Sequence, residues 1–442
     1  MGICIKNTIF YYLSAILNFL PFFSSLALTV LLGACASPTP PSTASNPQST
    51  KPEVEVHTGN ATAPSAKRDP SSLKELLDQV SRQKNIPLAF LDSGFKDVQH
   101  LSQVKKLVAP PPVSFQKNWR VYRSRFVEPV RIRAGLTFIE QNRAALEAAE
   151  SESGVPHQVI AAIIGVETIY GRQMGNFQVK DVLSTLAFDY PEAPNQAARE
   201  LLFQNQLKDL IILCWQEAKN RQDAFNRCLN QSRSYAGAIG LPQFMPGSIL
   251  QFATDGDGDG VIDLRNSRRD AIFSVANFLK VHGWQPGMPI YFSIIQNEQT
   301  QAKIVELADG QPIAKITVAE LIQLGILEPS NGDLLQGGVE PGSKALIVDL
   351  PSPGVNQEPD ILYVVGLQNF LSIVNYNRSY FYAQSVAEFA QALGYQNKSA
   401  FTRDQIEKPR PTPASKNRST TTKTAKKDSK VKKSSKPPKP SN

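Results

Sequence analysis

The sequence predicts an α+β protein that is mainly α-helical, in which a helical core carries an N-terminal helical lobe and a small β-containing insertion. Apolar residues recur at the 3.6-residue spacing of helices through residues 71–288, and this spacing returns over residues 367–400. In residues 289–366, short β-branched runs are separated by Gly, Pro and Asn turns, a pattern typical of strands. A body of this length can bury several packed layers, and no internal repeat is visible.

The helical part before the insertion is divided into two regions. Residues 71–150 form the predicted N-terminal helical lobe, and residues 151–288 form the predicted core. The segments in which apolar spacing predicts a helix are 73–84, 124–152, 155–170, 195–217 and 269–282.

The insertion is expected to hold strands, turns and one helix. Its β-branched runs cover residues 289–295, 302–307, 345–350 and 361–365. Residues 318–324 have helical spacing instead. A last helix over 379–393 belongs to the C-terminal segment 367–400, which we expect to close the cleft of the core.

Residues 1–34 have the pattern of a lipoprotein signal peptide. Residues 7–32 are largely apolar behind Lys6, and Leu-Gly-Ala then precedes Cys35, the residue that would be lipidated after cleavage. The alternative is an uncleaved transmembrane anchor, since the apolar stretch is long enough to span a bilayer. Lipidation is favoured because Cys35 directly precedes a polar Ala-Ser-Pro-Thr-Pro-Pro linker.

The residues after Cys35 indicate where such an anchor would lie. Ala36 and Ser37 supply no aspartate, which resembles the outer-membrane default of Gram-negative lipoproteins. Residues 35–70 are rich in Pro, Ser, Thr and Ala without a periodic apolar pattern, so we expect a disordered tether. The protein is therefore expected to be exported and lipid-anchored to the periplasmic face of the outer membrane.

The segment 401–442 is a Lys-rich tail that we expect to be disordered. Residues 408–442 contain twelve Lys or Arg and one acidic residue, Asp428, so they carry +11 while the whole chain carries +8. We expect no nucleic-acid partner, because an exported chain meets little nucleic acid. The tail fits anionic lipid, lipopolysaccharide or acidic wall polymer. A solvated tail without a specific target is the alternative.

Two of the four cysteines are left for a disulfide. Cys4 leaves with the signal peptide and Cys35 takes lipid. Cys214 and Cys228 then remain in an oxidising compartment, where a disulfide is permitted, and we expect them to be bridged. The sequence has no zinc-ligand spacing.

Glu167 is a single carboxylate inside an otherwise apolar predicted helix that stops at Gly171. Desolvation and the negative end of the helix dipole both disfavour its ionised form, so its pKa should be raised. A carboxylic acid with a raised pKa can donate a proton at neutral pH, and protonating a glycosidic oxygen is the commonest task of such an acid. The alternative is a glutamate that merely points to solvent at the helix end.

Several ordered motifs surround this glutamate. They are Glu167-Thr-x-Tyr-Gly-Arg, Met174-Gly-Asn-Phe-Gln-Val, Leu183-Ser-Thr-Leu-Ala-Phe-Asp-Tyr-Pro191, Ser234-Tyr-Ala-Gly-Ala-Ile-Gly-Leu-Pro-Gln-Phe-Met-Pro246 and Tyr376-Asn-Arg-Ser379. Over residues 73–395 the chain resembles the lytic murein transglycosylase B family, which cleaves the glycan of the bacterial cell wall. The resemblance implies a lysozyme-like core and peptidoglycan glycan strands as the substrate, and we expect a monomer.

The resemblance also assigns roles to the positions that match the family's motifs. Glu167 would be the sole catalytic acid and base. The side chains that would bind the sugar or shape its site are Ser234, Gln243, Tyr376, Asn377, Met174, Gly175 and Phe244. Hydroxyl and amide donors beside an apolar face suit an N-acetylated sugar. The family commonly has Gly where this chain has Pro242, so the local backbone is expected to differ.

A single carboxylate implies lytic transglycosylation, because a retaining or inverting glycosidase needs two. Glu167 would protonate the oxygen between N-acetylmuramic acid and N-acetylglucosamine, and then help the muramoyl C6 hydroxyl close on C1 to give a 1,6-anhydro end. A lysozyme-type muramidase is the alternative, with a second carboxylate from Glu152, Asp181 or Asp189. Another alternative is a catalytically idle peptidoglycan-binding lipoprotein, against which the intact Glu167 motif argues.

A second motif, Asp255-Gly-Asp257-Gly-Asp259-Gly-Val261, predicts a metal loop. Three carboxylates at alternate positions, with glycines between them, let a tight loop turn its oxygens onto one hard cation, as in an EF-hand. We expect a structural Ca²⁺ ion there and no organic cofactor. An acidic surface turn without metal is the alternative.

The closing ligand of this loop departs from the strict EF-hand. The twelfth position holds Asn266 in place of the usual Glu. The family that the chain resembles has a longer EF-hand-like loop, which implies that Asp270 closes the site and that the carbonyl of Val261 completes it.

Overall fold

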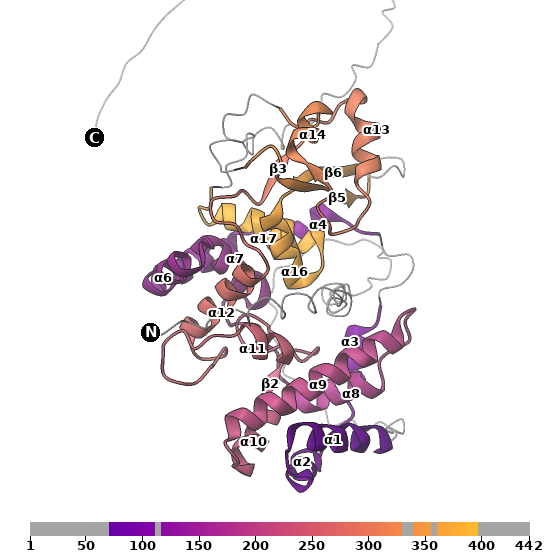
Figure 1. Cartoon of the computed structure of the whole chain (residues 1–442), viewed down its shortest axis with the longest axis vertical. Helices are drawn as coiled ribbons and strands as arrows, with labels where there is room; N and C mark the ends of the chain where they lie inside the picture. The colour runs from indigo at the N-terminus through magenta and orange to yellow at the C-terminus, as the bar shows by residue number, and fades with distance from the viewer. Residues whose placement is uncertain (1–69, 111–115, 329–338, 355–359, 397–442) are drawn as a thin grey trace, which may run out of the picture. The chain divides into compact units, whose positions relative to one another are not determined.

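The computed structural model describes residues 70–110, 116–328, 339–354 and 360–396. Helices dominate these residues, and the strands form two small antiparallel sheets (Figure 1). The predicted mainly helical α+β fold is therefore confirmed. The predicted signal peptide, Cys35, nearly all of the tether and the Lys-rich tail lie outside the described residues.

The helices and strands have the following bounds. The helices are α1 (Pro70–Lys84), α2 (Leu88–Phe95), α3 (Ser102–Val108), α4 (Trp119–Ser124), α5 (Pro129–Gln141), α6 (Arg143–Ser153), α7 (His157–Thr168), α8 (Val179–Phe188), α9 (Gln196–Ala218), α10 (Gln222–Leu229), α11 (Pro246–Phe252), α12 (Arg268–Val281), α13 (Glu298–Leu307), α14 (Val318–Gln323), α16 (Gln368–Asn377) and α17 (Tyr380–Ala392). The strands are β1 (Phe177–Gln178), β2 (Ser232–Arg233), β3 (Tyr291–Ser293), β4 (Ile316–Thr317), β5 (Lys344–Ser352) and β6 (Asp360–Gly366).

Three apolar cores hold these elements together. The first core packs α5, α6 and α7 with α12, α16 and α17. The second core packs α1, α2 and α3 with α8, α9 and α10. The third core lies between the larger sheet and the helices α13 and α14. The segment 71–150 therefore contributes α1–α3 to the second core and α4–α6 to the first.

Helix α7 is the most deeply buried element of the first core. Every residue from Val159 to Val166 is buried, and α5, α6, α12 and α17 all pack against the helix. Burying one Ile or Leu side chain stabilises the fold by roughly 1.5–3 kcal/mol, so this helix is firmly fixed. The helix ends at Thr168, and Ile169 and Tyr170 follow in the left-handed region with φ of 50° and 57°.

The larger sheet has the strand order β3-β6-β5-β4 and is antiparallel throughout. Its long central pair, β5 and β6, runs from Leu346 opposite Gly366 to Ser352 opposite Asp360. Two of the predicted β-branched runs, 345–350 and 361–365, lie in this pair. The alternating side chains of β5 serve two cores, because Leu346 and Val348 belong to the first while Ala345 and Ile347 belong to the third.

The run 302–307, expected to be extended, is helical, and that expectation is wrong. It lies in α13, which begins with a capping box in which Asn297 accepts from the Thr300 N–H at 3.0 Å and Thr300 Oγ1 accepts from the Asn297 N–H at 3.1 Å. Thr300 and Ile304, four residues apart, are buried on one face. The capped N-terminus and this spacing outweigh the strand preference of the β-branched pair Ile304–Val305.

The helix expected over 124–152 is two helices, α5 and α6. Asn142 separates them with φ −119° and ψ 21°, and its Nδ2 donates to the Phe138 carbonyl at 2.8 Å. An asparagine side chain that bonds to nearby backbone competes with helix continuation, which explains the break.

In the part of the chain that the structure describes, no helix combines the length and the apolar character needed to cross a bilayer.

Candidate active site

Glu167 lies on the last turn of α7 and is partly buried. Its Oε1 accepts a hydrogen bond from the hydroxyl of Tyr382 on α17, at 2.6 Å. Burial raises the pKa of Glu167 from 4.5 to about 7, and the Tyr382 hydrogen bond opposes this rise because it stabilises the ionised form. An acid with this pKa holds a proton for donation near neutral pH and can take one back afterwards.

Tyrosine rings enclose this carboxylate. Tyr382 is fully buried, and its ring stacks on that of Tyr376 with centroids 6.1 Å apart and planes 11° apart. Burial raises the pKa of both phenols well above 10, and the charge of Glu167 adds to the rise. The same two causes raise the pKa of Tyr122 on α4. All three tyrosines therefore stay protonated and act as neutral hydroxyl groups around the acid.

The end of α7 is held by a close approach of three elements. The Tyr170 ring stacks on Phe138 of α5 at 4.8 Å, and its hydroxyl reaches the backbone of both α5 and α7. A Cβ on Gly135 would lie 2.5 Å from that hydroxyl oxygen, and a Cβ on Gly165 would lie 2.4 Å from it. Only glycine fits at these positions without a shift. Arg131 of α5 also donates to the Gly165 carbonyl at 2.7 Å, which fixes the turn that precedes Glu167.

Ser234 lies in the loop after β2 and is buried. Its Oγ accepts from the Ala238 N–H at 2.9 Å and from the Ala236 N–H at 3.3 Å, so the hydroxyl shapes the loop while its proton can be donated. Gly175 lies against the same segment, since a Cβ there would be 2.3 Å from the Arg233 carbonyl oxygen. With φ of 81°, Gly175 allows the chain before β1 to pass this close to Ser234.

Gln243 and Phe244 lie on the next turn of the same loop. Gln243 has φ of 52°, and its Nε2 donates to the Gly240 carbonyl at 2.7 Å. Phe244 is buried, and its ring centroid lies 5.8 Å from that of Tyr376. Phe244 therefore packs against Tyr376 within the first core.

Further contacts join these predicted site residues into one group. The Tyr376 hydroxyl donates to the Pro242 carbonyl at 2.6 Å, which ties α16 to the loop beside Gln243. A backbone bridge between Ile239 and Phe244 connects that turn to the Ser234 end of the loop. Two further predicted residues lie next to this group and add no hydrogen bond to it among the described residues. Asn377 is buried at the end of α16, and Met174 packs against the first core.

Tyr382 and Tyr122 are the site residues that sequence reasoning missed. Both occur in helical segments whose apolar spacing makes an aromatic residue look like ordinary core. A weak signal for Tyr382 exists, because it follows Tyr376 by six residues within an aromatic-rich stretch that the family resemblance already singles out.

The carboxylates considered as a second catalytic group are engaged elsewhere. Asp181 on α8 accepts the Gln99 N–H at 2.8 Å in the second core. Asp189 accepts from His100 and Lys105, each at 2.6 Å. Glu152 is exposed on α6. Among the described residues, the structure gives no hydrogen bond or ion pair that joins any of these three to Glu167.

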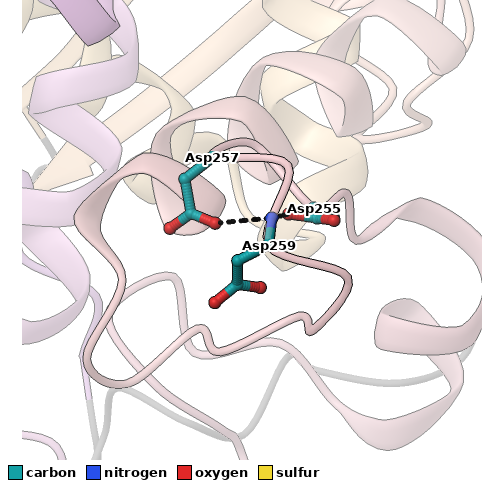
Figure 2. Close-up of side chains that lie close together, drawn as sticks. All are labelled: Asp255, Asp257 and Asp259. Atoms are coloured by element: carbon teal, nitrogen blue, oxygen red, sulfur yellow. Dashed lines mark hydrogen bonds between the residues drawn. The ribbon is translucent and has the colours of Figure 1, made fainter.

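The predicted metal loop brings three of its carboxylates together. Asp255, Asp257 and Asp259 are exposed, and each offers an oxygen within 4.8 Å of the others. Figure 2 shows the three side chains clustered on one turn, with the Asp259 N–H directed at Asp257. Asp255 accepts N–H groups of Gly258, Asp259 and Gly260, and these lower its pKa. The donor set of three carboxylates fits a hard cation.

Asp270 does not join this group of three. It is fully buried at the start of α12, where its Oδ1 accepts the Gly256 N–H at 2.9 Å and its Oδ2 accepts the Asp263 N–H at 2.7 Å. Asp270 thus links two parts of the loop, at Gly256 and at Asp263, to the start of α12. Val261 is exposed, and its N–H donates to Asp259 Oδ1 at 2.7 Å.

The structure joins Cys214 of α9 to Cys228 of α10 by a disulfide within the second core.

Comparisons with known proteins agree with this fold. The family model of the transglycosylase SLT domain matches residues 69–391. Membrane-bound lytic murein transglycosylase B of Escherichia coli (strain K12) is 32% identical over 326 residues, which are 74% of this chain and 78% of that protein.

Two solved structures are similar along most of their length. The Escherichia coli lytic transglycosylase Slt35 in complex with calcium is 29% identical with a TM-score of 0.58, over 73% of this chain and 92% of that chain. SltB3 from Pseudomonas aeruginosa in complex with NAG-NAM-pentapeptide is 26% identical with a TM-score of 0.59, over 74% of this chain and 80% of that chain.

The lysozyme-like helical fold and these similarities place the chain in the class of glycan-cleaving enzymes. Within that class, the chain belongs to the transglycosylase SLT domain family, among the lytic murein transglycosylases.

Proposed function

We propose that this protein cleaves the β-1,4 bond between N-acetylmuramic acid and N-acetylglucosamine in peptidoglycan and leaves 1,6-anhydro-N-acetylmuramic acid ends. Glu167 is the single acid and base. The observation that carries this proposal is a partly buried carboxyl group with a pKa of about 7 that accepts a 2.6 Å hydrogen bond from Tyr382. Hydrolysis with a nucleophile or a water-activating base would require a second carboxylate. Of the three candidates, Asp181 and Asp189 bind partners from other segments, and Glu152 is exposed on α6.

The proposed reaction needs one proton in each direction. Glu167 gives its proton to the glycosidic oxygen, the bond from that oxygen to muramoyl C1 breaks, and N-acetylglucosamine leaves with a hydroxyl group. The 2-acetamido carbonyl of the muramoyl sugar stabilises the positive charge at C1. Glu167 then takes the proton of the C6 hydroxyl as the O6–C1 bond forms, so the acid is restored and no water is consumed.

The substrate side of the proposal rests on the group of residues around Glu167 and on their two neighbours, Asn377 and Met174. Ser234, Gln243, Tyr376 and Asn377 supply hydroxyl and amide groups for the acetamido and hydroxyl groups of the sugars. Met174, Gly175 and Phe244 shape the site through packing and backbone approach. The tyrosine hydroxyls near Glu167 remain neutral, so they can orient the acid and its substrate without competing for the proton.

We further propose that the loop 255–270 binds a structural Ca²⁺ ion. The three clustered carboxylates of Asp255, Asp257 and Asp259 would hold it, and the similar Slt35 structure is in complex with calcium. The buried Asp270 accepts one backbone N–H on each of its oxygens, and each oxygen keeps a second lone pair with which it could also bind the ion. The ion would neutralise three exposed negative charges beside α12.

The proposed location is the periplasmic face of the outer membrane, through a lipid on Cys35. The E. coli relative is named as membrane-bound, and the sequence pattern of residues 1–37 supports export and lipidation. The Lys-rich tail would add attraction to anionic lipid, lipopolysaccharide or wall polymer. Deleting residues 408–442 should weaken binding to anionic liposomes at low salt and leave cleavage of soluble glycan chains unchanged.

Mass spectrometry of the products from purified cell wall tests the proposed reaction. Anhydro ends are lighter than reducing ends by one water, and only anhydro ends should appear. Reducing muramic acid ends would establish a lysozyme-type hydrolase instead. Binding of the wall without any cleavage would establish a non-catalytic wall-binding protein.

A further inference from the structure

Helix α4 is short, and its position depends on its neighbours. It runs only from Trp119 to Ser124, and helices shorter than about 12 residues are marginal in water without tertiary packing. It packs against α17 and β5 (Figure 1), and its N-terminus is capped by a bond from the Val121 N–H to the Asn118 side chain at 3.1 Å. Contacts with α17 and β5 therefore determine where the side chains of α4 lie.

Tyr122 is the side chain of α4 that concerns the catalytic acid. Burial and the charge of Glu167 raise the pKa of Tyr122, so the two groups are close enough to interact electrostatically. The hydroxyl oxygen of Tyr122 is buried and has no hydrogen-bond partner among the described residues. Its hydroxyl therefore does not hold Tyr122 in place, and the position of this ring depends on packing and on the other contacts of α4.

Aromatic rings join α4 to the residue that precedes Tyr382. The ring of Phe381 on α17 contacts both Trp119 and Tyr122, with centroid distances of 5.4 Å in each case. Trp119 and Tyr122 also stack on each other at 6.5 Å. Tyr382, the next residue after Phe381, donates its hydroxyl to Glu167. The packing of α4 on α17 thus involves both phenols near the acid.

Arg123 forms an ion pair that joins α4 to α17. Its Nε donates to Glu388 Oε2, and the two side chains are 28% and 14% exposed. The other oxygen of Glu388 accepts from Gln384 Nε2 at 3.2 Å, so both oxygens of this carboxylate are bonded. Glu388 lies seven residues after Phe381, which is two turns further along the same face of α17. The ion pair and the ring contacts therefore hold α4 to α17 at two points.

Arg120, on the same helix, forms a different kind of ion pair. It pairs with Asp360 of β6, but the two side chains are 69% and 54% exposed. Exposed pairs contribute little, because water screens them and two long side chains must be ordered. A largely buried pair is screened less, and the loss of one partner leaves the other charge without compensation. Of these two arginines, Arg123 is therefore the one on which the position of α4 depends.

We propose that Arg123 is a positioning residue, whose ion pair with Glu388 holds α4 on α17 so that Tyr122 keeps water away from the carboxyl group of Glu167. This proposal rests on the proposed function, because it concerns the environment of the same acid. Arg123 bonds to Glu388 rather than to Glu167, so it acts through α4. Burial raises the pKa of Glu167 to about 7, and water that enters beside a loosened α4 would lower it.

The sign of the effect distinguishes positioning from a direct effect of charge. A positive charge near a carboxylate favours the ionised form, so the loss of the Arg123 charge would by itself raise the pKa of Glu167. The charge of Glu388, left without its partner, would raise that pKa further. The entry of water lowers it. A pKa of Glu167 that falls when Arg123 is replaced therefore indicates positioning.

Other titratable groups near Glu167 are left in place by this change. The phenols of Tyr376 and Tyr382 have a pKa well above 10 and stay neutral. The guanidinium of Arg131 on α5 bonds to the Gly165 carbonyl at 2.7 Å. None of these groups bonds to Arg123 among the described residues, so a change in the pKa of Glu167 can be assigned to α4.

Titration of Glu167 in the full chain tests the proposal. NMR of glutamate labelled at the carboxyl carbon follows its ionisation, and the signal of Glu167 is identified by its loss in Glu167→Gln. Arg123→Met should lower the pKa of Glu167 by about one unit. The alkaline limb of kcat/KM should move down equally, so that cleavage falls about fivefold at pH 7 and stays nearly unchanged at pH 5.

Arg120→Met is the matched control, because it removes the same charge from the same helix but breaks an exposed pair. It should leave the pKa of Glu167 and the alkaline limb unchanged. If Arg123 merely adds stability to the fold, Arg123→Met would lower the melting temperature without moving the pKa of Glu167, and that result would overturn the proposal. An upward shift in Arg123→Met, or an equal downward shift in Arg120→Met, would overturn it too.

Arg123→Gln is the milder variant if Arg123→Met fails to fold. Its amide can still donate a neutral hydrogen bond to Glu388, so the pKa of Glu167 should move in the same direction but less far. A folded Arg123→Gln protein in which Glu167 titrates as in the unaltered chain would contradict the positioning role.

The two proposals fail in different ways. The NMR titration requires no catalysis, so a lowered pKa of Glu167 in Arg123→Met would support positioning even in a protein that forms no anhydro ends. That combination would overturn the proposed reaction alone. Anhydro ends made by a protein whose Glu167 titrates alike with and without Arg123 would overturn the positioning role alone.

Discussion

The end of α7 and the loop 255–270 both depend on carboxylates, and their environments are opposite. Glu167 is partly buried next to a phenol, and burial raises its pKa to about 7. Asp255 is exposed on a loop whose backbone N–H groups point at it, and they lower its pKa. One carboxyl group is therefore suited to carry a proton and the other to stay charged. The surroundings decide the role, since the functional group is the same.

The largest expected effect tests the role of Glu167 as the proton donor. Glu167→Gln removes the proton while nearly keeping the shape, so cleavage of peptidoglycan should fall by about 10²–10⁴-fold while binding to glycan persists. Release of soluble anhydro-muropeptides measures this. Glu152→Gln, on exposed α6, is the matched control. Comparable loss in the Glu152 variant would indicate a two-carboxylate hydrolase.

The same substitution should change stability with pH. Burial raises the pKa of Glu167 from 4.5 to about 7, so ionisation costs the folded state free energy as pH rises from about 4.5 to 7. The glutamine variant lacks this cost. It should therefore be more stable than the unaltered chain by on the order of 3 kcal/mol at pH 8 and show little gain at pH 4. Urea unfolding at both pH values measures the difference. A gain that is independent of pH would contradict the raised pKa.

Calcium tests the charged side of the comparison. An ion that binds only the folded state stabilises it by about 2.7 kcal/mol at a hundred times its dissociation constant, so calcium should raise the melting temperature. Asp257→Ala combined with Asp259→Ala should abolish that gain, because two of the three clustered carboxylates are lost. Asp92→Ala combined with Glu140→Ala removes two exposed acids elsewhere and should keep it. If neither calcium nor a chelator changes the melting temperature, the loop is an acidic turn that binds no calcium.

The smallest expected effect concerns the hydrogen bond from Tyr382 to Glu167. Cleavage requires the protonated acid, so kcat/KM should fall as pH rises through about 7. Tyr382→Phe removes the hydrogen bond that lowers this pKa, so the alkaline limb should move upward by about one pH unit. Tyr376→Phe is the matched control, because its hydroxyl bonds to the Pro242 carbonyl rather than to the acid. If the alkaline limb of the pH profile does not move in the Tyr382 variant, the Tyr382 hydroxyl does not influence the pKa of Glu167.

The sequence predicts the parts of the fold and site that depend on local pattern. Apolar spacing places α7, and its one carboxylate together with Gly171 marks Glu167. The alternating aspartates predict the cluster of Asp255, Asp257 and Asp259, which local loop geometry alone can form.

Contacts between elements that lie far apart in the sequence could not be predicted from local patterns. Tyr382 lies 215 residues from Glu167, and no local pattern indicates that α17 packs on α7. Asp270 shows the same limit: the family resemblance implies that it is a metal ligand, whereas its burial and its two bonds to the Gly256 and Asp263 N–H groups could not be predicted from the sequence. The misassigned run 302–307 shows the same limit in secondary structure, because the capping box at Asn297 outweighs residue preference.

The long separation between Glu167 and Tyr382 also determines when the catalytic acid is assembled. During synthesis the chain emerges from its N-terminus, so α7 is complete long before α17 exists. Until then Glu167 has neither the phenol that bonds to it nor the packed wall that excludes water from it. A nascent or truncated chain that lacks residues 380–392 therefore carries the glutamate without its catalytic setting. On the proposed mechanism, activity would therefore begin only once almost the whole folded body has been made.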